Sequence, residues 1–124
     1  MDKKTLSFRE RLKASDDIKR VFDKGTSFRG RLVSVFIIQN TGLPVNRAAF
    51  IIKKILYNKK TVFRNRFRRI IREGYRNAKF LLLPGHDIVI LATRVNNKTK
   101  STEIEKELID VFKKYTKKNH NIIS

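Results

Sequence analysis

The chain has 124 residues and a formal net charge of +19, which comes from 30 Lys and Arg against 11 Asp and Glu. With 40% hydrophobic residues, this length supports a single domain around one modest core. The lack of cysteine excludes disulfides and thiolate zinc sites, and no apolar run approaches the roughly 18 residues that a membrane span needs. Arg9 and Arg11 interrupt the segment that a signal peptide would keep apolar. We therefore expect a soluble, cytoplasmic protein.

The first elements are an arm and a short helix. Residues 1–14 are polar and basic, and we expect a basic N-terminal arm that is loosely held. Ser15 then offers a helix N-cap, and Gly25 offers a stop. Between them an i, i+3, i+4 stripe gives a narrow apolar face, formed by Ile18, Val21 and Phe22. The pattern predicts a helix of about ten residues.

Two strands joined by a loop are expected next. Residues 31–39 are rich in β-branched and aromatic side chains, and both faces of this strand are apolar enough to be covered. The period-2 pattern places Phe36 on the face opposite to Val35. A loop containing Pro44 follows, and residues 47–52 have the composition of a returning antiparallel strand.

After a basic loop over residues 53–60, residues 60–79 carry a strongly amphipathic helical pattern. Arginines recur every four residues and form one ridge of Arg64, Arg68, Arg72 and Arg76. Asn65 and Arg69 widen this ridge, and Arg66 lies on its flank. The opposite face is apolar and consists of Phe63, Phe67, Ile70, Ile71 and Ala78. Like charges one turn apart destabilise an isolated helix by about 0.2 to 0.5 kcal/mol per pair, so the ridge indicates an anionic partner such as a phosphate backbone.

A strand and a final helix complete the chain. Residues 87–93 form a continuous apolar run, which is typical of a central strand covered on both faces. Residues 102–115 form an amphipathic helix with acids early and lysines late, as the helix dipole favours. Residues 117–124 are expected to be a frayed C-terminal tail. Residues 15–116 are therefore the expected domain.

The basic residues are concentrated in the middle of the chain. From Arg47 to Lys79 there are twelve Lys or Arg and one acid, Glu73. Arginine outnumbers lysine there by seven to five, and its planar guanidinium suits bidentate contact with phosphate. Such a field attracts polyanions. We therefore interpret the chain as a nucleic-acid-binding protein rather than one that binds an anionic membrane surface.

Side chains suited to catalysis or metal binding are scarce. His86 precedes Asp87, but this pair is more typical of a turn before a strand than of a catalytic dyad. Four of the eleven acids lie on the last helix, where helix polarity and solvation explain them: Glu103, Glu105, Glu107 and Asp110. No phosphate-binding glycine motif or metalloprotease motif occurs. The sequence thus predicts no catalytic residue and no metal site in the protein.

The arginine helix also carries a family resemblance. Its run from Arg64 to Glu73, RNRFRRIIRE, resembles the RNR motif of the bacterial ribonuclease P protein subunit. The likeness covers nearly the whole chain. Residues 11–31 are similar to the family's opening segment, Lys53-Lys54 to its paired lysines, and residues 86–94 to its late strand. On these motifs the chain is identified as a member of that family.

The resemblance implies an α+β fold, a single α-β-β-β-α-β-α domain like ribosomal protein S5 domain 2. Its mixed four-stranded sheet would have a left-handed βαβ crossover through the RNR helix, and a short fourth strand would lie near residues 26–28. The implied function is that of ribonuclease P, the endonuclease that removes the 5′ leader of precursor tRNA to generate mature tRNA 5′ ends. In this family the RNA subunit carries the active site and its Mg²⁺, while the protein binds the leader. Neither a membrane nor an obligate protein partner is implied.

Site residues follow from the ridge and the resemblance by position. Contact with the ribonuclease P RNA is expected from Lys53, Lys54, Arg64, Asn65, Arg66, Arg68, Arg69, Arg72 and Arg76. The leader cleft would be lined by Ile18, Phe22 and Phe36, because stacking platforms in a basic groove hold a single strand of variable sequence. The chain departs from the family pattern in three places. Ile18 replaces a common phenylalanine, Ile52 replaces a usual serine, and the loop before the RNR motif is longer and lacks its glycine.

Three alternatives stay open at this point. Phe22 and Phe36 would be ordinary core residues if no cleft existed. A ribosomal-protein-like RNA binder would share the charge and the α/β sheet, and it would copurify with ribosomal RNA instead of ribonuclease P RNA. A protein-only nuclease would need clustered acids in a cleft, and it would cleave with Mg²⁺ but without added RNA.

Overall fold

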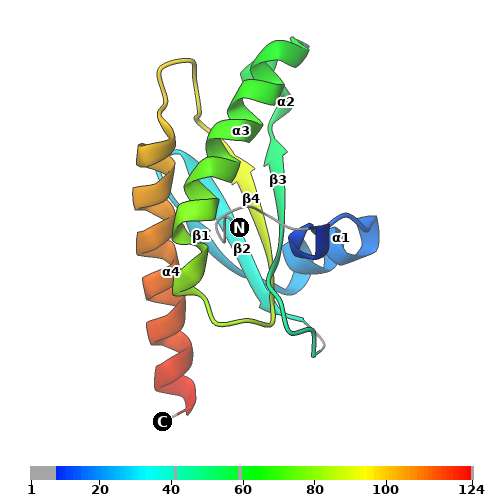
Figure 1. Cartoon of the computed structure of the whole chain (residues 1–124), viewed down its shortest axis with the longest axis vertical. Helices are drawn as coiled ribbons and strands as arrows, with labels where there is room; N and C mark the ends of the chain where they lie inside the picture. Colours follow the sequence, from blue (N-terminus) through cyan, green and yellow to red (C-terminus); the bar gives the residue numbers. More distant parts are fainter. Residues whose placement is uncertain (1–7, 41, 59, 124) are drawn as a thin grey trace.

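The computed structural model describes residues 8–40, 42–58 and 60–123 of the chain (Figure 1). Its elements in chain order are η1 (Phe8–Glu10), α1 (Ser15–Lys24), β1 (Thr26–Arg29), β2 (Val33–Gln39), β3 (Arg47–Ile52), α2 (Lys54–Tyr57), α3 (Thr61–Ala78), η2 (Lys79–Leu81), β4 (His86–Ala92) and α4 (Ser101–Ile123). The fourth strand expected near residues 26–28 is present as β1. The basic loop expected before the arginine helix contains the additional one-turn helix α2.

The four strands form one mixed sheet in the order β1-β2-β4-β3. Neighbouring pairs β1–β2 and β2–β4 are antiparallel, and β3–β4 is parallel. The prediction that residues 47–52 return antiparallel to β2 is therefore wrong. β4 lies between β2 and β3, because its apolar run is buried almost throughout and gains most from a neighbour on each edge.

The connection from β3 to β4 passes through α3. In Figure 1 both strands point upward, α3 lies in front of the sheet, and β4 lies to the left of β3. This arrangement is the left-handed sense of crossover, which is rare among parallel strand connections. The mixed four-stranded sheet and the crossover expected from the family resemblance are confirmed.

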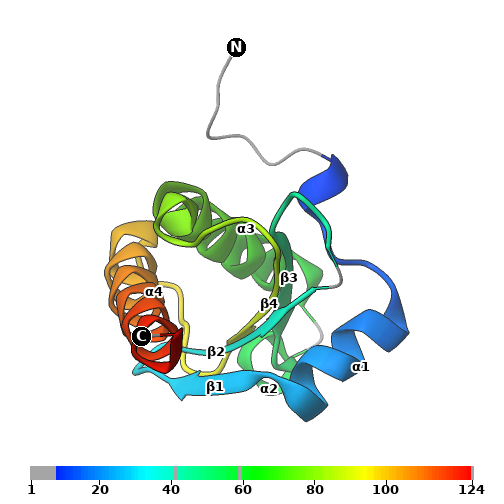
Figure 2. The ribbon, with the colours of Figure 1, turned by 90° about the horizontal axis from the view of Figure 1, so that it is seen from below.

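Helices cover the sheet on both sides. Figure 2 shows α3 and α4 on one side and α1 on the other. The main core lies beneath α3 and α4, where the aligned residues Val35, Ile90 and Phe50 face the buried side chains of Tyr75 and Phe112. A smaller cluster lies beneath α1 and is built around Leu12, Val21, Ala49 and Val89.

α3 and α4 approach each other closely at one glycine. A Cβ placed on Gly74 would lie 2.8 Å from Ile104 Cγ2 and 2.9 Å from the backbone nitrogen of Glu105. Glycine lowers helix stability by about 1 kcal/mol relative to alanine. Its presence in the middle of α3 is therefore explained by the space that α4 occupies.

Both ends of the expected domain differ from the prediction. Within the arm, Leu12 is buried and its backbone nitrogen donates to the oxygen of Ala48 at 3.0 Å, so residues 11–12 lie against the edge of β3. Ser15 is the first residue of α1 and Ala14 is the N-cap. At the other end α4 continues to Ile123 because neither glycine nor proline follows Tyr115 to end it. The part of the arm in residues 1–7 lies outside the described residues.

None of the helices in the described part of the chain is long and apolar enough to cross a membrane.

Candidate nucleic-acid interface

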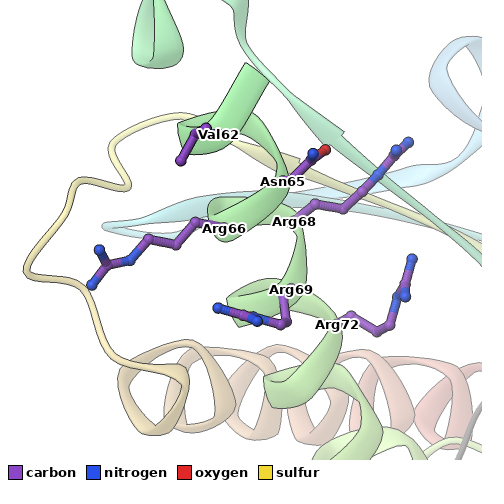
Figure 3. Close-up of a pocket in the computed structure, with 6 residues that line it drawn as sticks. All are labelled: Val62, Asn65, Arg66, Arg68, Arg69 and Arg72. Carbon is purple, nitrogen blue, oxygen red and sulfur yellow. The ribbon is translucent and has the colours of Figure 1, made fainter. Parts of the chain in front are cut away.

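The exposed face of α3 forms a basic hollow. A cavity of about 820 Å³ is lined by Val62, Asn65, Arg66, Arg68, Arg69 and Arg72, and we call these residues the arginine surface. In Figure 3, Arg68 and Arg72 extend to one side of α3, and Arg66 and Arg69 extend to the other. No acid lines this cavity. The opposite face of the helix is packed into the protein, as its amphipathic pattern predicts.

Arg68 is the most crowded cation of this surface. It is half-buried between Arg64 and Arg72, and its Nε donates to the backbone oxygen of Phe50 at 3.4 Å. Burial lowers the pKa of Arg68, and the charges of Arg64 and Arg72 lower it further. Arginine nonetheless stays protonated in proteins. An anionic ligand would therefore relieve repulsion that the protein itself leaves uncompensated.

Several contacts hold these side chains in place before any ligand binds. Nη2 of Arg66 donates to the backbone oxygen of Asn97 at 3.3 Å. The guanidinium carbon of Arg64 lies 6.0 Å from the ring centroid of Tyr57, and that of Arg72 lies 6.0 Å from the ring centroid of Phe50. Positioning of this kind reduces the entropy that is lost on binding.

The other residues expected at this interface lie apart from the hollow. Arg76 is half-buried and forms an ion pair with Glu73 one turn earlier on α3. Lys53 and Lys54 are exposed where β3 ends and α2 begins. The structure thus brings together Asn65, Arg66, Arg68, Arg69 and Arg72, with Arg64 beside Arg68. Lys53, Lys54 and Arg76 do not line the hollow.

The three cleft residues do come together beneath α1. Ile18, Phe22 and Phe36 are all half-buried and pack on the smaller core cluster. The rings of Phe22 and Phe36 meet edge to face, with centroids 4.8 Å apart. Both residues therefore pack against the core while keeping part of their surface exposed.

A groove along the edge of β3 joins the two surfaces. It has a volume of about 370 Å³, and its lining includes Arg11, Lys13, Ile18, Arg68 and Arg72. Arg68 and Arg72 belong to the arginine surface as well, and Ile18 belongs to the cleft. Basic side chains and apolar residues of β3 therefore share the walls of this groove.

The sequence alone did not single out Arg11 and Lys13 as binding residues. They lie in a segment that we expected to be loose, whereas the pairing of Leu12 with Ala48 fixes them beside α3. The available sequence signal was an apolar residue, Leu12, between two cations. This pattern indicates that Arg11 and Lys13 are held in place only once Leu12 is known to be buried.

Comparison with known proteins adds an independent observation. Residues 6–116 match a family model described as Ribonuclease P. The chain belongs to the ribonuclease P protein family. It is thus a protein component of the bacterial enzyme of tRNA 5′ processing, and its partner is a ribonuclease P RNA.

Individual ribonuclease P proteins agree with this in sequence and structure. The ribonuclease P protein component of Clostridium acetobutylicum is 33% identical over 105 residues, which cover 84% of this chain and 87% of that protein. The RNase P protein of Staphylococcus aureus superposes with a TM-score of 0.70 at 28% identity, covering 84% of this chain and 93% of that one. That of Thermotoga maritima gives a TM-score of 0.69 at 25% identity, covering 86% and 97%.

In this ribonuclease P protein, charged residues fasten α1 to the sheet. Arg20 on α1 donates to the backbone oxygen of Gln39 at 2.9 Å. Arg47 on β3 lies 3.5 Å from Asp17 of α1 and also binds the buried Asp87 of β4. The hydrogen bond with Asp87 is the main cause that raises the pKa of Arg47.

The histidine considered for catalysis has a structural role. His86 is buried, its Nδ1 lies 2.8 Å from the backbone oxygen of Leu83, and its ring meets that of Tyr115 with centroids 5.3 Å apart. Within the described ranges, no three His, Asp or Glu side chains converge as a metal site. The side chains of the arginine surface instead support binding of an anionic polymer.

Proposed function

We propose that this ribonuclease P protein binds the catalytic RNA mainly through the arginine surface of α3. The observation that carries the proposal is the hollow lined by four arginines and no acid, with a fifth arginine, Arg64, beside it. Lys53, Lys54 and Arg76 extend the contact along the RNA on either side of the hollow. Arginine forks suit phosphate oxygens, and counterion release from the RNA supplies much of the affinity.

The 5′ leader of precursor tRNA is proposed to lie in the cleft of Ile18, Phe22 and Phe36. The partial exposure of Phe22 and Phe36 supports this, because base stacking on aromatic rings tolerates any leader sequence. Ile18 contributes an apolar contact. The groove along β3 then carries the leader backbone past Arg11 and Lys13 toward the RNA subunit.

Catalysis is assigned to the RNA subunit in this proposal. Mg²⁺ would be held mainly by that RNA, and the protein would supply affinity for precursor tRNA and support the active form of the RNA. The holoenzyme would work in the cytoplasm without an obligate protein partner.

The test is cleavage of precursor tRNA at low Mg²⁺ with ribonuclease P RNA, with and without the chain. We expect cleavage by the mixture at Mg²⁺ concentrations where the RNA alone is nearly inactive. The protein alone, pretreated with nuclease and then repurified, should not cleave. Cleavage by that sample would instead indicate a protein-only nuclease, and copurification with ribosomal RNA alone would indicate a ribosomal RNA binder.

A further inference from the structure

A separate hollow lies where α3 ends and η2 begins. It has a volume of about 550 Å³, and its walls include Glu10, Asn46, Tyr75, Lys79, Phe80 and Leu82. We call it the η2 groove. Its lining residues Tyr75, Lys79 and Phe80 belong to the end of α3 and to η2, and Figure 1 shows the chain turning from the lower end of α3 toward β4. None of the residues assigned above to the arginine surface or the leader cleft lines it.

Tyr75 gives this groove an unsatisfied donor. Its side chain is 0% exposed, and its hydroxyl has no hydrogen-bond partner among the described residues. Burial raises the pKa of this hydroxyl, and the Glu10 carboxylate raises it further, so the group is a protonated donor at neutral pH. Tyr75 and Glu10 both line the groove, so the Tyr75 side chain borders the space that an acceptor would enter. A buried donor of this kind is stabilised by an acceptor that enters the groove.

Phe80 gives the groove an aromatic platform. Its side chain is 63% exposed, and Nζ of Lys79 lies 5.4 Å from its ring centroid. Arg9 is exposed on the same wall, while the charge of Glu10 is compensated by Lys79 at 2.9 Å. An exposed ring flanked by cations is the arrangement that binds unstacked bases of a nucleic acid.

We propose that the η2 groove holds one unpaired nucleobase of the ribonuclease P RNA. The base stacks on Phe80, and one of its carbonyl oxygens or ring nitrogens accepts the hydrogen bond of Tyr75. This inference rests on the proposed function, because the RNA must first bind along α3.

The position of the η2 groove favours the RNA subunit, rather than the leader, as its ligand. The groove follows the arginine surface along α3, whereas the proposed leader cleft lies with α1 on the other side of the sheet. A second copy of the chain is a poor occupant, because two molecules of net charge +19 repel each other. An RNA brings the opposite charge and a flat ring with acceptors.

The experiment measures affinity for ribonuclease P RNA and thermal stability of the free protein for three variants. Phe80→Ala should weaken RNA binding about 5- to 150-fold, as expected for one lost stacking platform. Tyr75→Phe should weaken it about 2- to 10-fold, the effect of one hydrogen bond, while the Tm of the free protein stays equal or rises. Leu81→Ala is the matched control, since Leu81 is 41% exposed on the same turn but does not line the groove, and its binding should not change.

Chemical probing of the RNA provides a second measurement. Wild-type protein should protect one unpaired base of the RNA from modification, and Phe80→Ala should remove that protection. Wild-type RNA affinity for both Phe80→Ala and Tyr75→Phe would overturn the inference. If Arg69→Ala weakened RNA binding in the same series, the proposed role of the arginine surface would stand. If Arg69→Ala left RNA binding unchanged, both the proposed function and the η2 groove inference would be overturned.

Two further outcomes would also count against the groove. A lower Tm for Tyr75→Phe would show that its hydroxyl already has a partner inside the protein. A loss confined to precursor tRNA, with RNA-subunit affinity intact, would place the leader in the groove instead.

Discussion

Arg47 holds both carboxylate oxygens of Asp87, with Nε 2.9 Å from Oδ1 and Nη2 2.7 Å from Oδ2. This ion pair joins the parallel strands β3 and β4, in which Arg47 and Asp87 lie directly opposite each other. Asp87 is 0% exposed, and Asn40 also donates to its Oδ1 at 3.3 Å. The same Arg47 reaches Asp17, so one guanidinium ties both parallel strands to α1.

Asp87→Asn should therefore destabilise the fold. The substitution leaves the guanidinium of Arg47 without its buried counter-charge, and breaking such a pair costs about 3 to 5 kcal/mol. We expect the lower end of this range, because the Arg47 side chain is 22% exposed. Urea unfolding measures the loss. Asp110→Asn is the control, since it breaks an exposed pair with Lys114 on α4 and should hardly change the midpoint. Equal effects of the two substitutions would contradict this role of Asp87.

Arg69→Ala and Arg72→Ala should each weaken binding to ribonuclease P RNA while leaving the fold intact. Both side chains are exposed on the arginine surface, so no packing is lost. Each loss of a phosphate contact should flatten the slope of log K against log salt by somewhat less than about one unit. Lys106→Ala removes an equal charge from the exposed side of α4 and serves as control. If it flattened the slope as much, binding would depend on net charge alone.

Phe36→Leu should reduce affinity for precursor tRNA more than affinity for mature tRNA. Leucine keeps most of the apolar packing against Phe22 but removes the aromatic face, and one stacking platform contributes about 1 to 3 kcal/mol. Binding of both tRNAs to the reconstituted holoenzyme gives the comparison. Phe28→Leu is a control on another strand, where the ring packs on Tyr115. Parallel losses for both tRNAs would show that Phe36 is a core residue and no platform.

Gly74→Ala should destabilise the protein although alanine favours helix. The new methyl would press on Ile104 and on the backbone of α4, and overpacking of this kind costs about 1 to 3 kcal/mol. Asn77→Ala, also on α3, shows the propensity effect alone and should be neutral or slightly stabilising. Thermal unfolding of both variants decides the matter. A higher Tm for Gly74→Ala would mean that α4 moves aside at little cost.

The amphipathic pattern of residues 60–79 was sufficient to predict both the position and the exposed face of α3. Helical periodicity is a local property, and a ridge repeated every four residues falls on one side whatever the rest of the chain does. The RNR motif on this ridge and the charge of the central stretch then indicated the partner. The strands β2, β3 and β4 were likewise predictable as segments.

Pairing and contact between distant segments were decided only by the tertiary structure. β3 was expected beside β2, but the burial of β4 on both faces and both edges placed it between them. Arg11 and Lys13 line the groove along β3 because Leu12 is buried against that strand. The Tyr75 hydroxyl has no hydrogen-bond partner among the described residues because the packing of α3 buries it in the protein. Local sequence determines which face of an element is apolar or charged. Which element covers that face depends on how the whole chain buries its apolar surface at once, and no local pattern carries that information.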